Sequence, residues 1–189
     1  MPSRGSSRAF CPSCGEEVEV FVTLSGGAER AHCSLCGLAL EELSEPPRAK
    51  QLDTVLIAED SALLRRTLYD MLIENKLAKR VYTYRDGKEF ISSVTEEMKE
   101  GTPVSLVILD VNMPGVNGID AARILRALEE RLQRPKKIPI LFFTVVKCDE
   151  RFRKMLELCK PSAYMNKSSS STPERLTQRV REVIKRLLE

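Results

Sequence analysis

The sequence predicts an α/β protein in which a doubly wound, five-stranded parallel sheet of strand order 2-1-3-4-5 follows a small cysteine-rich module. Two observations lead to this fold class. From residue 53 onward, short apolar runs alternate five times with stretches whose apolar residues recur at helical spacing, which is the pattern of repeated strand–helix units. Before residue 45, four cysteines stand in two C-x-x-C pairs on either side of an alternating apolar stretch.

Composition divides the chain into four parts. Residues 1–8 are expected to be a flexible N-terminus, 9–44 the cysteine-rich module, 45–52 a linker and 53–189 the α/β domain. The double proline of SEPPRAKQ, from Ser44 to Gln51, marks the linker. The one low-complexity segment of the sequence is the serine run Ser168 to Ser171.

The cysteine pairs CPSCG and CSLCG are separated by eighteen residues. This spacing predicts a structural zinc site, because two thiolates from each tight turn complete a closed tetrahedral shell. The glycine after each pair tolerates the positive φ that such a turn requires. Two disulfides or a redox pair are the alternatives, and His32 is interpreted as a bystander beside a complete ligand set. The expected zinc ligands are Cys11, Cys14, Cys33 and Cys36.

The rest of the module alternates as EVEVFVTL over residues 17–24, which predicts a strand, and Ser25-Gly26-Gly27 is expected to turn it into a hairpin. A module of roughly 35 residues buries little core, so the metal must supply much of its stability. The module resembles a zinc ribbon, a fold used for protein or nucleic-acid contacts or for structure alone. Seven acidic residues against Arg30 between Ala9 and Glu45 favour a protein partner, with DNA binding as an alternative.

The α/β domain is expected to contain five strands, at 54–58, 80–84, 104–109, within 138–146, and at 163–165. The third run is apolar throughout, as a parallel strand buried on both faces should be. Ser61 is expected to cap the first helix, and Thr172-Pro173 to open the last. This arrangement is the flavodoxin-like one. The helical stripes are Leu64, Leu68, Met71 and Leu72; Phe90, Ile91, Val94 and Met98; Ile124, Leu125, Leu128 and Leu132; Phe152, Met155, Leu156 and Cys159; and Leu176, Val180, Val183, Ile184 and Leu187.

Polar residues follow four of these strands. Strand one ends in Glu59-Asp60, strand three in Asp110 and strand four in Thr144, and strand five leads to Lys167. These strands are neighbours in the expected order, so the groups should meet at one rim, where such sheets bind ligands. Clustered carboxylates need a cation, and their oxygens suit Mg²⁺. A carboxylate beside Mg²⁺, an ammonium and a hydroxyl can accept a phosphoryl group.

The motifs around this rim resemble the receiver domain of response regulators in bacterial two-component signalling, of the chemotaxis-regulator type. The resemblance covers Asp53 to Glu189. Its motifs are Glu59-Asp60, Asp110-x-x-Met113-Pro114-x-x-x-Gly118, Thr144 and Tyr164-x-x-Lys167.

The resemblance implies that Asp110 accepts a phosphoryl group from a sensor histidine kinase. It also implies that Mg²⁺ is held by Asp60, Asp110 and the main-chain carbonyl of Asn112, with Glu59 contributing through water. The protein would then be a phosphoacceptor that at most assists its own phosphorylation and dephosphorylation, and not an enzyme in the usual sense.

The resemblance further implies that Lys167 contacts the phosphoryl group and that Thr144 hydrogen-bonds it. Tyr164 would change rotamer and remodel the surface that partner proteins read. Homodimerisation on phosphorylation stays open, as does the identity of the kinase and of the downstream target.

Three departures from the family pattern stand near the expected site. Ser168 follows Lys167 where the family usually has proline, Val145 stands where a small residue is usual, and Cys159-Lys160 replaces a common Ala-Gly. A degenerate receiver acting as a constitutive interaction scaffold is therefore an alternative. An aspartate-nucleophile phosphatase is disfavoured, because that chemistry typically uses a second acid where Asn112 stands.

The remaining expectations come from the chain as a whole. Its formal net charge is +3, and no run approaches the ~18 apolar residues of a membrane span. The N-terminus lacks a signal-peptide core, so a cytoplasmic protein is expected. No further domain is expected after Glu189, so the expected output is phosphorylation-controlled protein contact, with nucleic acid disfavoured.

Overall fold

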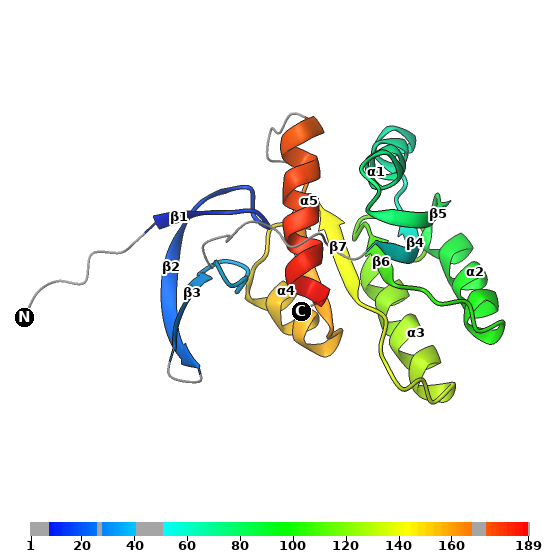
Figure 1. Cartoon of the computed structure of the whole chain (residues 1–189). Coiled ribbons are helices and arrows are strands. Elements are labelled where there is room, and N and C mark those ends of the chain that lie inside the picture. The colour runs from blue at the N-terminus through cyan, green and yellow to red at the C-terminus, as the bar shows by residue number, and fades with distance from the viewer. Residues whose placement is uncertain (1–7, 26–27, 41–50, 168–172, 189) are drawn as a thin grey trace, which may run out of the picture.

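The computed structural model describes residues 8–25, 28–40, 51–167 and 173–188 of the chain. These residues form a three-stranded antiparallel sheet of order β1-β2-β3 and a five-stranded parallel sheet of order β5-β4-β6-β7-β8 (Figure 1). The second order is the expected 2-1-3-4-5. The Gly26-Gly27 turn, residues 1–7 and 45–50, the serine run and the Thr172 cap lie outside the described residues.

The N-terminal sheet contains β1 (Arg8–Cys11), β2 (Glu16–Ser25) and β3 (Ala28–Cys33). The alternating face of β2 changes character along its length. Val18 is buried in a core cluster that also contains residues of α4, whereas Val22 and Leu24 are exposed. Only the end of the hairpin near the cysteines therefore shares a core with the α/β domain.

The α/β domain alternates strands and helices as expected. Ser61 caps α1 by accepting a hydrogen bond from the Leu64 amide, and Asp86, Asn117 and Asp149 cap the next three helices in the same way. Its elements are β4 (Leu52–Ala58), α1 (Ala62–Glu74), β5 (Ala78–Tyr84), α2 (Gly87–Lys99), β6 (Leu106–Leu109), α3 (Gly118–Arg131), β7 (Ile140–Thr144), α4 (Glu150–Leu158), β8 (Ser162–Asn166) and α5 (Pro173–Leu188).

Two apolar cores lie on opposite faces of the parallel sheet. One contains side chains of α2, α3 and α4, such as Phe90, Leu125 and Phe152, and continues into the cysteines of the N-terminal module. The other contains side chains of α1 and α5, such as Leu68 and Val183. Burial on both faces explains why β6 is apolar throughout. Among the described residues, no helix is long and apolar enough to cross a membrane.

The expected apolar stripe of α3 was partly wrong. Ile124 and Leu132 are exposed, and the buried side of the helix carries Gly118, Ala121, Ala122 and Leu125. Small residues let this helix approach the sheet closely. The side of the helix that carries glycine and alanine therefore faces the sheet, and some of its larger apolar side chains stay exposed. Further along the same side, the helix buries an ion pair that apolar periodicity does not reveal.

That ion pair joins Arg126 and Glu129, whose closest atoms are 2.6 Å apart. Arg126 also donates to the carbonyls of Ile138 and Cys159, and Glu129 accepts from the Ile138 amide at 2.5 Å. The pair therefore satisfies main-chain groups at the start of β7 and at the end of α4. Hydrogen bonding of this kind makes burial of two charges tolerable.

Candidate functional site

The carboxyl ends of β4, β6, β7 and β8 meet at one edge of the sheet. The parallel register pairs Ala58 with Leu109, so the residues that follow each strand, Glu59 and Asp110, lie side by side. The Asp110 amide also donates to the Ala58 carbonyl at 2.9 Å. The register of two buried strands, rather than any local turn, thus brings the two carboxylates together.

Lys167 lies between these carboxylates. Its Nζ is 2.7 Å from Glu59 Oε2 and 2.8 Å from Asp110 Oδ2, and its side chain is 7% exposed. The Lys167 amide donates to the Thr144 carbonyl at 2.9 Å, which fixes the start of the loop after β8 against the end of β7. The lysine is therefore a buried member of the rim and not a surface residue.

The electrostatics of the rim favour a divalent cation. One oxygen each of Glu59, Asp60 and Asp110 lies within 4.8 Å of the others, so three carboxylates face one ammonium. Burial raises the pKa of Glu59, Lys167 lowers it, and the neighbouring Asp110 raises it further. Asp60 is exposed, so the rim opens to solvent at that residue. Hard oxygen ligands with open positions fit Mg²⁺.

The loop after Asp110 turns back on the site. The Asn112 amide donates to Asp110 Oδ1 at 3.1 Å, and the Gly118 amide donates to the Val111 carbonyl at 3.1 Å. A Cβ at Gly118 would overlap the Asp110 carbonyl oxygen. The glycine therefore allows α3 to begin directly against the backbone of the central aspartate.

The other two expected residues, Thr144 and Tyr164, are linked through the segment after β7. Thr144 Oγ1 accepts from the Val146 amide at 3.2 Å, and the Tyr164 hydroxyl donates to the Val146 carbonyl at 2.9 Å. Burial raises the pKa of Tyr164 to about 12, so its hydroxyl keeps its proton. Val145, which lies between Thr144 and Val146 in the sequence, is 53% exposed.

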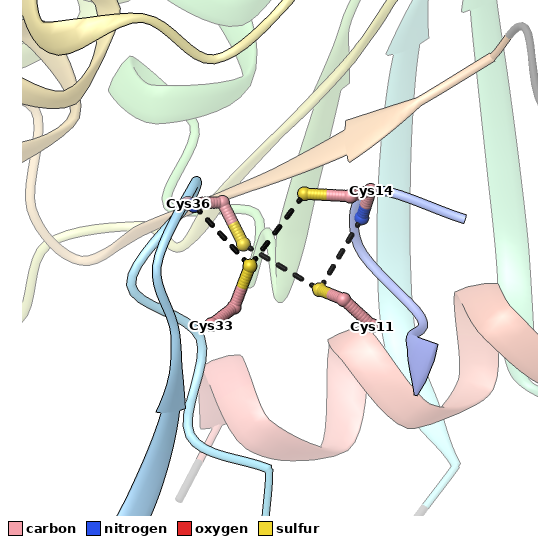
Figure 2. A group of neighbouring side chains, drawn as sticks. All are labelled: Cys11, Cys14, Cys33 and Cys36. Carbon is pink, nitrogen blue, oxygen red and sulfur yellow. Dashed lines mark hydrogen bonds between the residues drawn. The ribbon is translucent and has the colours of Figure 1, made fainter. Parts of the chain in front are cut away.

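The four expected zinc ligands form a second cluster. Their sulfur atoms point toward one another from two turns of the N-terminal module (Figure 2), all within 4.8 Å. Cys11 and Cys36 have sulfurs 3.6 Å apart, and Cys14 and Cys33 have sulfurs 3.8 Å apart. A tetrahedral ion with Zn–S bonds of about 2.3 Å places its sulfurs roughly 3.8 Å apart, so the cluster fits zinc.

The backbone around the cysteines supports the same reading. Each turn donates one amide to the first thiol of its pair, from Cys14 to Cys11 and from Cys36 to Cys33, both at 3.4 Å. Hydrogen bonds among the four thiols lower the pKa of Cys33 and Cys36, whereas the pKa values of Cys11 and Cys14 are raised. Gly15 and Gly37 both have φ of 78°, as expected from the sequence.

The remaining cysteines and the histidine lie outside this cluster. His32 exchanges hydrogen bonds with Thr23 Oγ1 and the Gly37 carbonyl, and its ring stacks on Phe21. Cys159 is buried at the end of α4, as core filler should be, and Cys148 is half-buried after β7.

Sequence reasoning missed the residues that join the two clusters. Ser13, inside the first cysteine turn, contacts β8 at Tyr164 and Asn166, and Arg153 and Arg179 contact the cysteine turns from α4 and α5. A serine in a turn and two arginines on helices carry no signal of their own. Their pairing depends on how the two sheets pack against each other.

Comparison with known proteins identifies the class. Residues 55–181 match the response regulator receiver domain, so the chain belongs to that family. A protein-glutamate methylesterase/protein-glutamine glutaminase of Methanococcus maripaludis is 37% identical over 92 residues, which are 49% of this chain and 22% of the relative. The same enzyme of Bacillus subtilis is 36% identical over 36% of this chain and 18% of its own length. The matched segment thus spans about a fifth of these relatives.

Solved structures share the fold at low sequence identity. The response regulator domain of Thermotoga maritima CheB aligns with a TM-score of 0.57 and 18% identity, over 73% of this chain and 97% of its own. The receiver domain of the Arabidopsis thaliana histidine kinase CKI1, solved with Mg²⁺ and beryllofluoride, aligns with a TM-score of 0.56 and 21% identity, over 70% and 90%. These likenesses confirm the expected fold.

Proposed function

We propose that the protein is a two-component response regulator whose Asp110 accepts a phosphoryl group from a sensor histidine kinase. The observation that carries the proposal is the position of Lys167 Nζ, which lies 2.8 Å from Asp110 Oδ2 at a rim with two further carboxylates. The ammonium and Mg²⁺ would offset the charge of phosphoryl oxygens, and Thr144, at the carboxyl end of the neighbouring strand β7, would supply a hydroxyl donor.

The proposal assigns each remaining residue one task. Asp60, Asp110 and the Asn112 carbonyl hold Mg²⁺, and Glu59 contributes through water. Tyr164 senses the state of Thr144 through the Val146 carbonyl. The protein would act as a phosphoacceptor and not as an enzyme with a separate substrate, and it would signal through protein contact in the cytoplasm.

The proposed division of the chain gives each cluster its own module. Residues 9–44 form a zinc ribbon in which Cys11, Cys14, Cys33 and Cys36 hold one structural Zn²⁺. Residues 53–189 form the receiver, joined to the ribbon by a linker over 45–52. With four thiolates, the zinc has no open position and serves structure or interaction rather than chemistry.

Native mass spectrometry before and after treatment with acetyl phosphate and Mg²⁺ tests the proposal. We expect one zinc per chain and a single labile phosphoryl adduct on the wild-type protein. The adduct should be missing from Asp110→Asn and present on Asp70→Asn, a matched control whose carboxylate lies on α1 and pairs with Arg66. Zinc without an adduct would instead identify a degenerate receiver that signals through constitutive contacts.

A further inference from the structure

The zinc ribbon covers the edge of the parallel sheet. β8 is an edge strand of that sheet, and a single ribbon residue, Ser13, forms two hydrogen bonds with its main chain. The Asn166 amide donates to the Ser13 carbonyl at 2.7 Å, and Ser13 Oγ donates to the Tyr164 carbonyl. Open edges expose unpaired main-chain groups, and here the ribbon satisfies the Tyr164 carbonyl and the Asn166 amide.

Two arginines complete this contact in the same manner. Arg179 of α5 donates to the Pro12 carbonyl at 2.7 Å, and Arg153 of α4 donates to the Leu35 carbonyl at 2.8 Å. Pro12 and Leu35 each lie between the two cysteines of one pair. Each metal-binding turn is therefore held by one guanidinium, and the ribbon is docked through the parts that the zinc would shape.

An open cleft of about 990 Å³ lies beside the docked interface, with Phe10 on one side and Lys147 on the other. The ribbon packs only part of its surface on the α4–β8–α5 face, through residues such as Cys14 and Val18 in the core that contains Phe152. Side chains that border the cleft lack the dispersion contacts that full packing would supply. A partly packed contact of this kind suits reversible docking.

A chain of hydrogen bonds joins this interface to the phosphorylation site. Thr144 Oγ1 accepts from the Val146 amide, the Val146 carbonyl accepts from the Tyr164 hydroxyl, and that hydroxyl accepts from Asn166 Nδ2 at 2.7 Å. Ser13 then holds the main chain of Tyr164 and Asn166. The residue next in sequence to Asn166 is Lys167, which contacts Asp110.

We propose that the ribbon is the receiver's own readout element, and that a phosphoryl group on Asp110 weakens its docking on the α4–β8–α5 face. This inference rests on the proposed function. When Thr144 moves toward a phosphoryl group, its hydroxyl leaves the Val146 amide, and the segment that anchors Tyr164 shifts. Ser13 is bonded to the Tyr164 carbonyl and to the Asn166 amide, so this shift disturbs the docked ribbon.

Thermodynamic linkage makes the effect reciprocal. If phosphorylation weakens docking by some factor, docking weakens binding of a phosphoryl group or its analogue by the same factor. Couplings between sites typically amount to about fivefold to 100-fold. Released, the ribbon would uncover Tyr164, Arg153 and Arg179 together, and the face would become available to a partner.

Beryllofluoride affinity in the presence of Mg²⁺, measured by fluorine NMR on the full chain, tests the coupling. Ser13→Ala removes one docking hydrogen bond with little change of shape, and Arg153→Ala removes another from an exposed position. Both variants should bind the analogue about fivefold to 100-fold more tightly than the wild type. Arg151→Ala, two residues away on α4 and equally exposed, is the matched control and should bind as the wild type does.

Three other results would each contradict part of this account. Equal affinities in all four proteins would overturn the coupling while leaving the phosphoacceptor role intact. Weaker binding by Ser13→Ala and Arg153→Ala would reverse its direction and overturn it too. Failure of every protein to bind beryllofluoride would overturn the proposed function, and the coupling with it.

Hydrogen exchange supplies a readout that needs no substitution. Beryllofluoride with Mg²⁺ should speed exchange of the Asn166 amide, because that amide donates to Ser13 across the interface. The Lys167 amide donates within the receiver to Thr144 and serves as an internal reference. Unchanged protection of Asn166 at saturating beryllofluoride would contradict release of the ribbon.

Discussion

At the scale of single residues, the candidate site consists of common ionisable side chains, most of which are buried. Lys167 is 7% exposed because it follows the edge strand at the point where Glu59 and Asp110 meet. Glu59 is 1% exposed, and desolvation by burial is the main cause of its raised pKa. The same burial that brings these groups together makes their charges costly without a cation.

Replacement of Glu59 by glutamine should change how stability depends on pH. The pKa of Glu59 is raised above its ordinary 4.5 in the folded protein, so the folded state binds this proton more tightly than the unfolded state. The contribution of Glu59 to stability is therefore present at low pH and is lost as pH rises above 4.5. Glu59→Gln lacks this dependence, so it should gain stability relative to the wild type as pH rises.

Denaturant unfolding of both proteins between pH 4.5 and 8, with and without Mg²⁺, measures this difference. Saturating Mg²⁺ should diminish it at high pH, because the cation favours the charged carboxylate that glutamine lacks. A difference in the free energy of unfolding that stays constant with pH would show that burial of Glu59 does not penalise its charge.

At the scale of elements, the start of α3 shows how a helix and a strand end share one narrow space. The β6–α3 loop returns so closely that Gly118 lies against the Asp110 carbonyl. The Asn117 side chain caps the helix at the same point by accepting from the Asp120 amide at 2.9 Å. The position of the helix and the position of the Asp110 backbone are therefore fixed together.

Gly118→Ala should damage both stability and phosphorylation. The new methyl group overlaps a backbone carbonyl that cannot move freely, so the variant should lose about 1–3 kcal/mol of stability. Displacement of the Asp110 backbone should slow phosphorylation by acetyl phosphate roughly 100-fold, the usual effect of a misplaced reacting group. Thermal unfolding and native mass spectrometry report the two effects.

Gly101→Ala is the control for this substitution. Gly101 has φ of 76°, but a Cβ there would have no atom within 4 Å. It should lose about 1–2 kcal/mol through backbone strain alone and keep normal phosphorylation. Equal phosphorylation of the two variants would indicate that α3 can move without disturbing Asp110.

At the scale of the whole molecule, two modules with separate sheets share one core. Cys11, Cys14 and Cys33 belong to the same apolar cluster as Phe152 and Tyr164. The small module would thus draw stability from two sources, the proposed zinc that orders its turns and the α4–β8–α5 face that holds their carbonyls. Removal of the metal should disturb the contact before it disturbs the receiver.

Zinc chelation should therefore unfold the ribbon and leave the receiver folded. Structural zinc in small domains contributes roughly 10–16 kcal/mol of apparent binding free energy, far more than so small a core. We expect rapid hydrogen exchange over residues 8–40 after chelation, loss of protection at Asn166, and unchanged protection of β4, β6 and β7. Cys33→Ser should show the same pattern without chelator.

Cys148→Ser is the matched control, because Cys148 is a free cysteine near the ribbon but outside the four-thiol cluster. It should retain one zinc per chain by mass. Loss of zinc from this variant would mean that the ligand set differs from the one proposed. Cooperative loss of the whole receiver on chelation would show that the two modules unfold as one unit.

The sequence determined the strand order, the cysteine cluster and the rim. Apolar runs that repeat with helical stripes specify a doubly wound sheet, whose switch point lies where β4 and β6 end. The C-x-x-C spacing defines its cluster locally, because each turn is short and closed. Glu59, Asp110 and Lys167 each follow a strand directly and Thr144 ends one, so sheet order and parallel register are enough to gather them.

Which surfaces of the two modules meet depends on their packing in three dimensions. The docking of Ser13 on β8, the two arginines on the cysteine turns and the buried Arg126–Glu129 pair join elements between which no local pattern predicts contact. From the sequence alone, an arginine on a helix is expected to be exposed to solvent. Its contact with another element becomes evident only once the acceptor of its hydrogen bonds is known. Ile124 and Leu132 are exposed because α3 packs close to the sheet and places its alanine and glycine residues on the inner face.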